Sequence, residues 1–324
     1  MNNTEYDYLP ATHASEDGTR TAFTILAYFV VASVVLAAVI GTQLPFLNNS
    51  DKNQASTLEG TIQHIEEQPS KKPAMLSFDV STLNARAVIV YDVVRNEPLF
   101  EFNAHKRLPL ASLAKIMTAL VAIEYFDPDT QVTITEKTLK TEGDEGLLVH
   151  DRLSVASLAS LTLVSSSNDG AEALANVTNR ETFIAQMNER ARELDLVQTS
   201  FFNPSGLDIN ERLSGGYGSA ADIAHLLLIS VQTAPNIFAP TIKPIFHTSS
   251  YRVKNTNNRI DDITGLIASK TGFTDLAGGN LAIMFDAGLA QPIIVVVLGS
   301  TPDGRFDDAY NLANATRAYL AIER

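Results

Sequence analysis

The stretch that decides the fold is Pro109–Tyr125, PLASLAKIMTALVAIEY, in which a proline precedes a long apolar segment. Its large apolar residues recur at the three- and four-residue spacing of one helix face. Pro109 breaks the chain before this pattern starts, so the sequence predicts that Ser112 lies at or near a helix N-terminus. Lys115 follows three residues later, which places its side chain on the same helix face as the hydroxyl of Ser112.

Patterns on both sides of this helix predict the rest of the domain. Before it, residues 87–94 and 98–102 read as a hairpin of two strands. After it, helical patterns lie at 153–164, 170–177, 180–194 and 219–229, within a helical lobe over about 130–230. β-rich runs follow at 248–255, 265–271, 280–285 and 292–298, and a helical pattern covers 305–321. This order predicts an α+β fold, an antiparallel sheet flanked by helices with an all-α lobe.

Composition and charge exclude several classes of function. The chain has 324 residues, 45% of them hydrophobic, so it can fold around a real core. Its 37 acidic against 24 basic residues, a net charge of -13, oppose a nucleic-acid partner, which would need Lys and Arg at phosphates. There is no cysteine, and the six histidines show no metal-ligand spacing. We therefore expect no disulfide, no metal and no cofactor.

The N-terminal region predicts a membrane anchor. Residues 22–41, AFTILAYFVVASVVLAAVIG, carry no charge and are long enough for a helix to cross a bilayer once. A cleaved signal peptide is the alternative, but the preceding segment is acidic, unlike a signal peptide's basic start. We expect a short cytoplasmic tail over 1–21, a transmembrane anchor over 22–44, a linker over 45–84 and a catalytic domain over 85–324. Lys and Arg counts near the anchor do not orient it.

Three short motifs could carry chemistry: Ser112-Leu-Ala-Lys115, Ser166-Ser-Asn168 and Lys270-Thr-Gly272. A serine hydroxyl becomes a good nucleophile when a base takes its proton, and lysine serves as that base when burial or nearby cations favour its neutral amine. Taken singly, each motif has an ordinary structural explanation, as a helix cap, a solvated lysine or a turn. Their order and their placement on a helix start, an interhelical loop and a strand favour a shared catalytic site.

In combination the three motifs resemble those of the serine penicillin-recognising enzymes. The segments PLASLAKIMTALVA, SSSNDGAEALA, SFFNPSGLD, YGSAADIAHLL, YRVKNTN and SKTGFTDLAGGNLA are similar, more narrowly, to the low-molecular-mass D-alanyl-D-alanine carboxypeptidases of the S11 peptidase type. The resemblance extends from about Leu83 to Tyr319. Where the family often has glycine this chain has Ser167, which leaves Ser166 and Ser167 as alternatives for the serine that faces the site.

The resemblance implies an acylation mechanism. Ser112 would attack the carbonyl between two D-alanines, with Lys115 accepting its proton, and water would then release the acyl-enzyme. Ser166 would relay the proton to the leaving amine, and Asn168 would bond both Lys115 and the substrate amide. Backbone N–H groups of Ser112 and Phe273 would form the oxyanion hole. Phe273 stands where the family often carries His or Tyr.

The resemblance also implies a substrate and a location. Lys270 and Thr271 would hold the terminal carboxylate of a peptidoglycan stem peptide ending in D-Ala-D-Ala, helped by Arg305, while Gly272 leaves room for substrate along the strand. β-Lactams would acylate the same serine as inhibitors. Such a substrate places the catalytic domain outside the bacterial cytoplasmic membrane, as a single-pass protein held by its N-terminal helix.

Three alternatives stay open at this point. A DD-endopeptidase of peptidoglycan cross-links would use the same acyl chemistry. A β-lactamase would need a loop that activates water for fast deacylation, and Glu172–Asn176 lies too close to Ser166, inside an expected helix, to supply one. A non-catalytic cell-wall binding protein would have no need of the complete nucleophile set.

Overall fold

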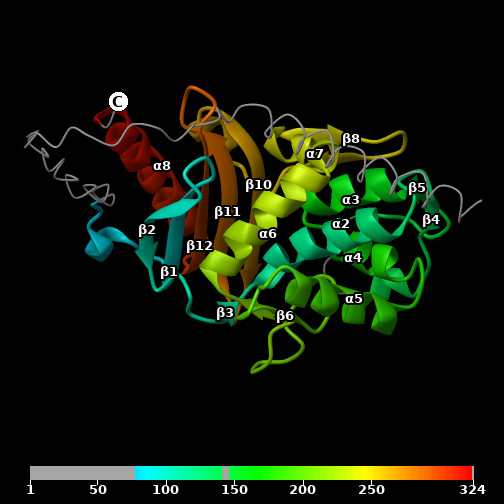
Figure 1. Ribbon diagram of the computed structural model, residues 1–324. Helices are drawn as coiled ribbons and strands as arrows, with labels where there is room; N and C mark the ends of the chain where they lie inside the picture. The colour runs from blue at the N-terminus through cyan, green and yellow to red at the C-terminus, as the bar shows by residue number, and fades with distance from the viewer. Residues whose placement is uncertain (1–76, 141–145, 323–324) are drawn as a thin grey trace, which may run out of the picture. The chain divides into compact units, whose positions relative to one another are not determined.

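A five-stranded antiparallel sheet forms the centre of the domain (Figure 1). The computed structural model describes residues 77–140 and 146–322. Within the sheet the strand order is β10-β11-β12-β1-β2, so that β10 and β2 are its two edges. The strands are β1 (Ala87–Asp92), β2 (Glu97–Phe102), β10 (Leu266–Thr274), β11 (Gly278–Asp286) and β12 (Pro292–Ser300).

Alternating side chains on these strands build two hydrophobic cores, one on each face of the sheet. On β12, Ile293, Val295 and Val297 pack into one core, and the residues between them pack into the other. Such alternation follows from the two-residue period of a strand whose two faces are both covered. The C-terminal helix α8 (Gly304–Ile322) covers one face, and the helical lobe covers the other (Figure 1).

The helical lobe surrounds α2, an almost completely buried helix. Every residue from Ala114 to Ala122 is buried, as expected for a helix that is apolar all round. Helix α6 lies between α2 and the sheet, in contact with β1, β11 and β12. The helices on this side are α2 (Ala114–Tyr125), α3 (Val155–Val164), α4 (Asn168–Ala175), α5 (Arg180–Glu193), α6 (Ala220–Thr233) and α7 (Pro235–Phe238).

The predicted fold class is confirmed, with two local corrections. The lobe is not purely helical, because it also holds short strand pairs formed by β4 (Gln131–Thr133), β5 (Arg152–Ser154), β6 (Ser200–Phe201) and β7 (Gly216–Gly218), the last also paired with β3 (Leu108–Pro109). The expected strand at 248–255 is instead a turn followed by the second half of a hairpin, β8 (Ile245–His247) and β9 (Arg252–Lys254). The hydroxyl of Thr248 accepts from the N–H groups of Ser250 and Tyr251 and so holds this turn.

The last residues assigned to the linker already pack against the domain. The ring of Phe78 meets that of Phe100 edge to face at 5.7 Å, and the backbone N–H of Asn84 donates to Asp308 at 3.0 Å. The predicted tail and anchor over 1–44 lie outside the described residues. In the part of the chain that the structure describes, no single helix has the length and apolarity to span a membrane. Within the described ranges, the helix pair Ala220–Thr233 and Pro235–Ile242, joined at a 110° bend, meets the length and composition criteria when its two parts are taken together.

Candidate active site

A strained turn presents Ser112 at the start of α2. Ala111 has a φ of 47°, a left-handed conformation that an L-residue with a side chain seldom adopts. Asn280 of β11 fixes this turn, because its buried amide donates to the carbonyls of Pro109 and Leu110, both at 3.0 Å. Ser112 itself stays half-exposed, two residues before α2 begins. The sequence prediction for its position is therefore confirmed.

Lys115 lies one helical turn further on and is 0% exposed. Its Nζ is 2.8 Å from the Oγ of Ser112, 2.7 Å from Oδ1 of Asn168 and 2.7 Å from the carbonyl oxygen of Ser205. None of these three partners carries a negative charge. At 2.8 Å from Ser112 Oγ, this amine in its neutral form can accept the proton of the serine hydroxyl.

Ser166, not Ser167, faces the second lysine of the site. Ser166 has a φ of 62°, and its Oγ accepts from the Nζ of Lys270 at 2.8 Å. Ser167 is fully buried and caps the N-terminus of α4, its Oγ accepting from the N–H of Gly170. The two alternatives left by the sequence thus separate into one serine at the site and one structural cap. Asn168, the first residue of α4, points back to Lys115.

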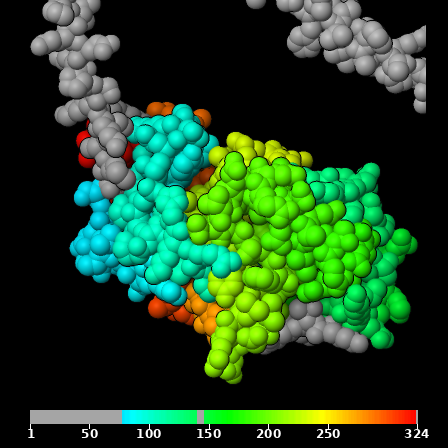
Figure 2. Space-filling model, turned by 60° about the horizontal axis from the view of Figure 1, so that its bottom comes forward, coloured from blue at the N-terminus to red at the C-terminus, as the bar shows by residue number. Residues whose placement is uncertain are grey.

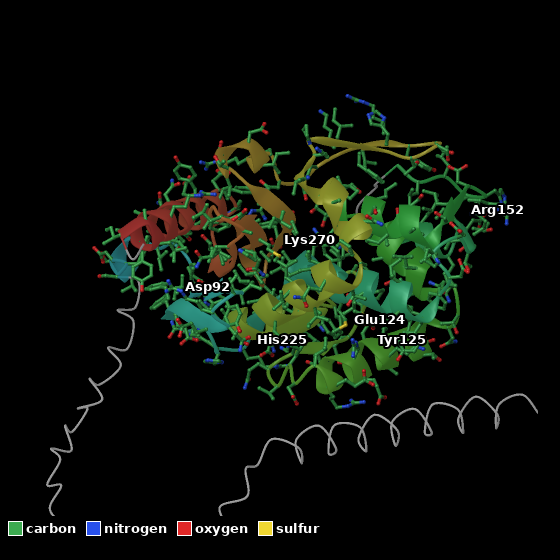
Figure 3. All side chains as sticks on the ribbon, turned by 45° about the horizontal axis from the view of Figure 1, so that its top comes forward. Asp92, Glu124, Tyr125, Arg152, His225 and Lys270 are labelled. Carbon is green, nitrogen blue, oxygen red and sulfur yellow. The ribbon has the colours of Figure 1, made fainter. Side chains whose placement is uncertain are left out.

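Strand β10 brings the third motif against the nucleophile. Lys270 is 1% exposed and lies where the sheet meets the helical lobe (Figure 3). Gly272 passes so close to the Ser112 turn that a Cβ there would be 3.2 Å from the backbone nitrogen of Ser112. The hydroxyl of Thr271 is 2.6 Å from that of Thr256, and Phe273 is 49% exposed. Because β10 is an edge strand, an extended peptide can lie beside it.

Arg305, at the start of α8, reaches the same strand. Its Nη1 donates to the carbonyl of Gly272 at 2.7 Å, and its guanidinium lies over the ring of Phe306. Burial lowers the pKa of Arg305, while Asp303 raises it. Among the described residues its buried Nε has no hydrogen-bond partner.

Sequence reasoning missed the residues that hold these groups in place. Asn203 accepts from the N–H of Gly206 at 2.7 Å and donates to the carbonyl of Leu207, which shapes the loop whose Ser205 carbonyl binds Lys115. Asp208 from the same loop accepts from the hydroxyl of Thr274 and the N–H of Leu276, just beyond Phe273. The sequence segment SFFNPSGLD indicated that this loop belongs to the site, but it did not predict the hydrogen-bond partners of Asn203 and Asp208.

The fold and the site together place a serine hydroxyl in hydrogen-bonding contact with a buried lysine amine, a pair of groups that can carry out acyl transfer. Among the described residues, Lys115 hydrogen-bonds to Ser112 and Asn168, Lys270 hydrogen-bonds to Ser166, and Arg305 donates to the backbone of Gly272 on β10. The sequence model of the D-alanyl-D-alanine carboxypeptidase family, peptidase S11, matches residues 72–301. The chain belongs to this family.

Known proteins of similar sequence carry two kinds of name. The chain is 29% identical over 259 residues to D-alanyl-D-alanine carboxypeptidase DacC of Escherichia coli, covering 75% of this chain and 64% of that protein. It is 30% identical over 221 residues to a D-alanyl-D-alanine endopeptidase of Haemophilus influenzae, covering 65% and 73% respectively. The matches to DacC and to carboxypeptidase DacF of Bacillus subtilis span only 64% and 59% of the length of those relatives.

Solved structures agree with the fold. Penicillin-binding protein D2 of Listeria monocytogenes, in a cefotaxime-bound form, is 29% identical with a TM-score of 0.64, covering 72% of this chain and 97% of that one. A mutant of the Streptomyces K15 DD-transpeptidase is 23% identical with a TM-score of 0.66, covering 73% and 98%. The chain therefore has the transpeptidase and β-lactamase type of α+β fold.

Proposed function

We propose that this chain is a serine-type D-Ala-D-Ala carboxypeptidase that removes the terminal D-alanine from peptidoglycan stem peptides. The observation that carries the proposal is the hydrogen bond between Lys115 and Ser112. A second bonded pair of lysine and serine, Lys270 and Ser166, belongs to the same site. Such a site performs acyl transfer, and membership of the family supplies the substrate class.

In the first step Ser112 Oγ bonds to the carbonyl carbon of the penultimate D-alanine while its proton passes to Lys115 Nζ. The backbone N–H groups of Ser112 and Phe273 would stabilise the oxyanion, a contribution of about 3–4 kcal/mol for each donor. The C–N bond then breaks, and the amine of the released D-alanine takes a proton from Ser166, which in turn takes up the proton that Lys115 received from Ser112. Lys270 holds Ser166 in place for this relay. Water hydrolyses the resulting ester and returns the proton to the serine.

β-Lactams would follow the same first step, because their strained amide presents a carbonyl to Ser112. The cefotaxime-bound relative supports this reading. We also propose that residues 22–44 anchor the chain in the bacterial cytoplasmic membrane, with 1–21 inside and the catalytic domain outside. The uncharged run and the location of peptidoglycan support that topology.

The endopeptidase names among the relatives favour a second candidate, cleavage of peptidoglycan cross-links. The two activities differ in whether the group beyond the scissile bond ends in a free carboxylate. If Lys270, Thr271 and Arg305 bind that carboxylate, an acid gains charge-assisted bonds that an amide lacks. One such bond is worth about 1.5–3 kcal/mol, or roughly 10–100-fold in kcat/KM.

The test measures kcat/KM on two stem pentapeptides that differ only in a terminal acid or amide. We expect the acid to react roughly 10–100-fold faster, and Arg305→Ala to narrow that gap. Arg317→Ala, on the same helix but contacting Thr264 and the Phe285 ring, is the matched control and should leave the gap unchanged. Equal rates on acid and amide in the parent enzyme would reject the carboxypeptidase in favour of the endopeptidase.

A further inference from the structure

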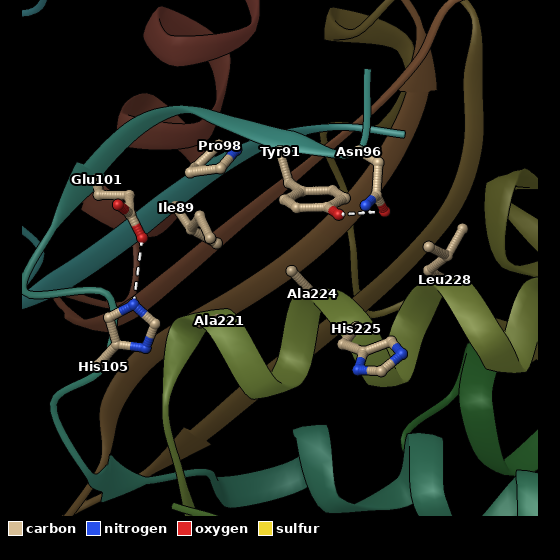
Figure 4. Close-up of a pocket in the computed structure, with 10 residues that line it drawn as sticks. All are labelled: Ile89, Tyr91, Asn96, Pro98, Glu101, His105, Ala221, Ala224, His225 and Leu228. Carbon is tan, nitrogen blue, oxygen red and sulfur yellow. Dashed lines mark hydrogen bonds and ion pairs between the residues drawn. The ribbon is translucent and has the colours of Figure 1, made fainter. Parts of the chain in front are cut away.

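A second cavity lies between the β1–β2 hairpin and α6. Its volume is about 480 Å³, within the range of small-molecule sites, which is roughly 300–1,000 Å³. Ile89 of β1 and Ala221, Ala224 and Leu228 of α6 form its apolar middle (Figure 4). In Figure 2 cyan residues from the part of the chain that holds the hairpin lie beside yellow-green residues from the part that holds α6, in agreement with the contacts between β1 and α6.

The cavity is separate from the serine site. The catalytic strand β10 is one edge of the sheet, whereas β1 and β2 lie at the other edge, with β11 and β12 between. At about 4.8 Å for each strand step, β1 lies roughly 14 Å from β10. Figure 3 likewise shows His225, which lines the cavity, well apart from Lys270. A ligand in the cavity therefore leaves Ser112 free to react.

Polar groups stand at both ends of the apolar middle. At one end the hydroxyl of Tyr91 donates to Oδ1 of Asn96 at 2.8 Å, which leaves the Asn96 amide nitrogen to donate elsewhere (Figure 4). At the other end His105 Nε2 is 3.4 Å from Oε1 of Glu101. The imidazole of His225 borders the cavity from α6.

The lining chemistry excludes several ligand classes. The described residues that line the cavity include Glu101 but no lysine or arginine, so phosphates and other anions are disfavoured. The described residues hold no group of three side chains suited to a metal ion. A purely apolar side chain from a protein partner would leave the polar ends desolvated without partners, which costs free energy. A neutral ligand with an apolar face and hydroxyl or amide groups at its rim would match both the apolar middle and the polar ends of the cavity.

We propose that this cavity binds N-acetylhexosamine units of the peptidoglycan glycan strand, an inference that rests on the proposed function. The C–H face of a pyranose ring would lie on the ring of Tyr91, and its acetamide methyl would occupy the apolar middle beside Ile89 and Ala224. Asn96 and Glu101 would bond its hydroxyl and amide groups. Holding the polymer here raises the local concentration of stem peptides around the serine site.

The test titrates the full-length chain, with labelled methyl groups, against N-acetylglucosamine trimer and against cellotriose, which lacks the acetamide. We expect NMR shifts confined to Ile89, Ala221, Ala224 and Leu228, with weaker effects from cellotriose. Tyr91→Leu keeps side-chain bulk but loses the ring and should weaken binding roughly tenfold. Asn96→Asp keeps the turn and the acceptor but loses the donor, and it should weaken binding as well. Tyr310→Leu, an exposed tyrosine on α8, is the matched control and should bind as the parent does.

Shifts elsewhere, or none up to about 10 mM trimer, would overturn the proposal, as would equal binding by all three variants. Saturation by an apolar peptide but not by the trimer would assign the cavity to a protein partner instead. Hydrolysis of a free stem pentapeptide is measured in parallel and should not change in Tyr91→Leu. Glycan binding without pentapeptide hydrolysis in the parent would refute the proposed function and leave the cavity assignment standing, and the converse result would refute only the cavity.

Discussion

Replacing Lys115 separates its chemical role from its structural one. In Lys115→Ala the serine loses its base, which typically costs 10²–10⁴-fold in rate, so acylation by a labelled penicillin should fall at least about 100-fold. The change also removes a fully buried side chain and leaves two acceptors, Asn168 Oδ1 and the Ser205 carbonyl, without their donor. Unmade bonds cost about 1–3 kcal/mol each, and the cavity costs about 2 kcal/mol or more.

These losses outweigh the few tenths of a kcal/mol that alanine gains from its helix propensity. We expect Lys115→Ala to lower the free energy of unfolding by about 4–8 kcal/mol. Lys115→Met retains most of the volume and should recover about 1–3 kcal/mol of this loss while remaining as inactive as the alanine variant. Lys137→Ala, at an exposed lysine bonded to Asn176, should change stability by less than about 0.5 kcal/mol and leave acylation intact.

Urea unfolding and the acylation rate are measured on the same preparations of each variant. If Lys115→Met is folded and still acylates within about threefold of the parent, Lys115 is not the base. If both variants are as stable as the parent, the buried bonds to Asn168 and Ser205 contribute less to the free energy of unfolding than we expect from their geometry.

Three further outcomes follow from the structure. Asp208→Ala removes the acceptor of the Thr274 hydroxyl and the Leu276 N–H, so the end of the strand that carries Phe273 should loosen. We expect kcat/KM for acylation to fall about tenfold with little change in the free energy of unfolding. Unchanged kinetics would show that Asp208 does not position Phe273. Asn280→Ala removes the hydrogen bonds to the carbonyls of Pro109 and Leu110 and takes the acceptor from the N–H of Gly299, and it should lower the free energy of unfolding in urea by about 2–4 kcal/mol. A loss below about 0.5 kcal/mol would contradict this. The chain should fractionate with membranes and keep its N-terminus, whereas a mature start near Gln43–Asn49 in a soluble fraction would indicate a cleaved signal.

The sequence predicted the fold class and the main helices because their signals are periodic and local. The alternation on β12 and the apolar spacing after Ser112 need no knowledge of distant partners. The turn at 248–251 was misread as strand because β-branched and aromatic residues there also suit a hairpin loop closed by Thr248. The packing of Phe78 was not predicted, because it depends on Phe100 in β2 and not on the polar residues around Phe78 in the sequence.

Within the site, the motifs predicted the reactive groups but not their support. Serine and lysine three residues apart on a helix must lie close, so the pair of Ser112 and Lys115 could be predicted from spacing alone. The roles of Asn280 and Asp208 could not, because each binds backbone groups more than 60 residues away in the chain. The choice between Ser166 and Ser167 also needed coordinates, since it depends on the left-handed backbone at Ser166.

The central claim is that Ser112 is the acylated nucleophile. The full-length chain is incubated with a labelled penicillin, digested, and the adduct is mapped by mass spectrometry, with release of D-alanine from a stem pentapeptide measured alongside. The account predicts one adduct, on Ser112, and loss of both adduct and D-alanine release in Ser112→Ala. A stable adduct on another serine, or none on the folded parent chain, would contradict it.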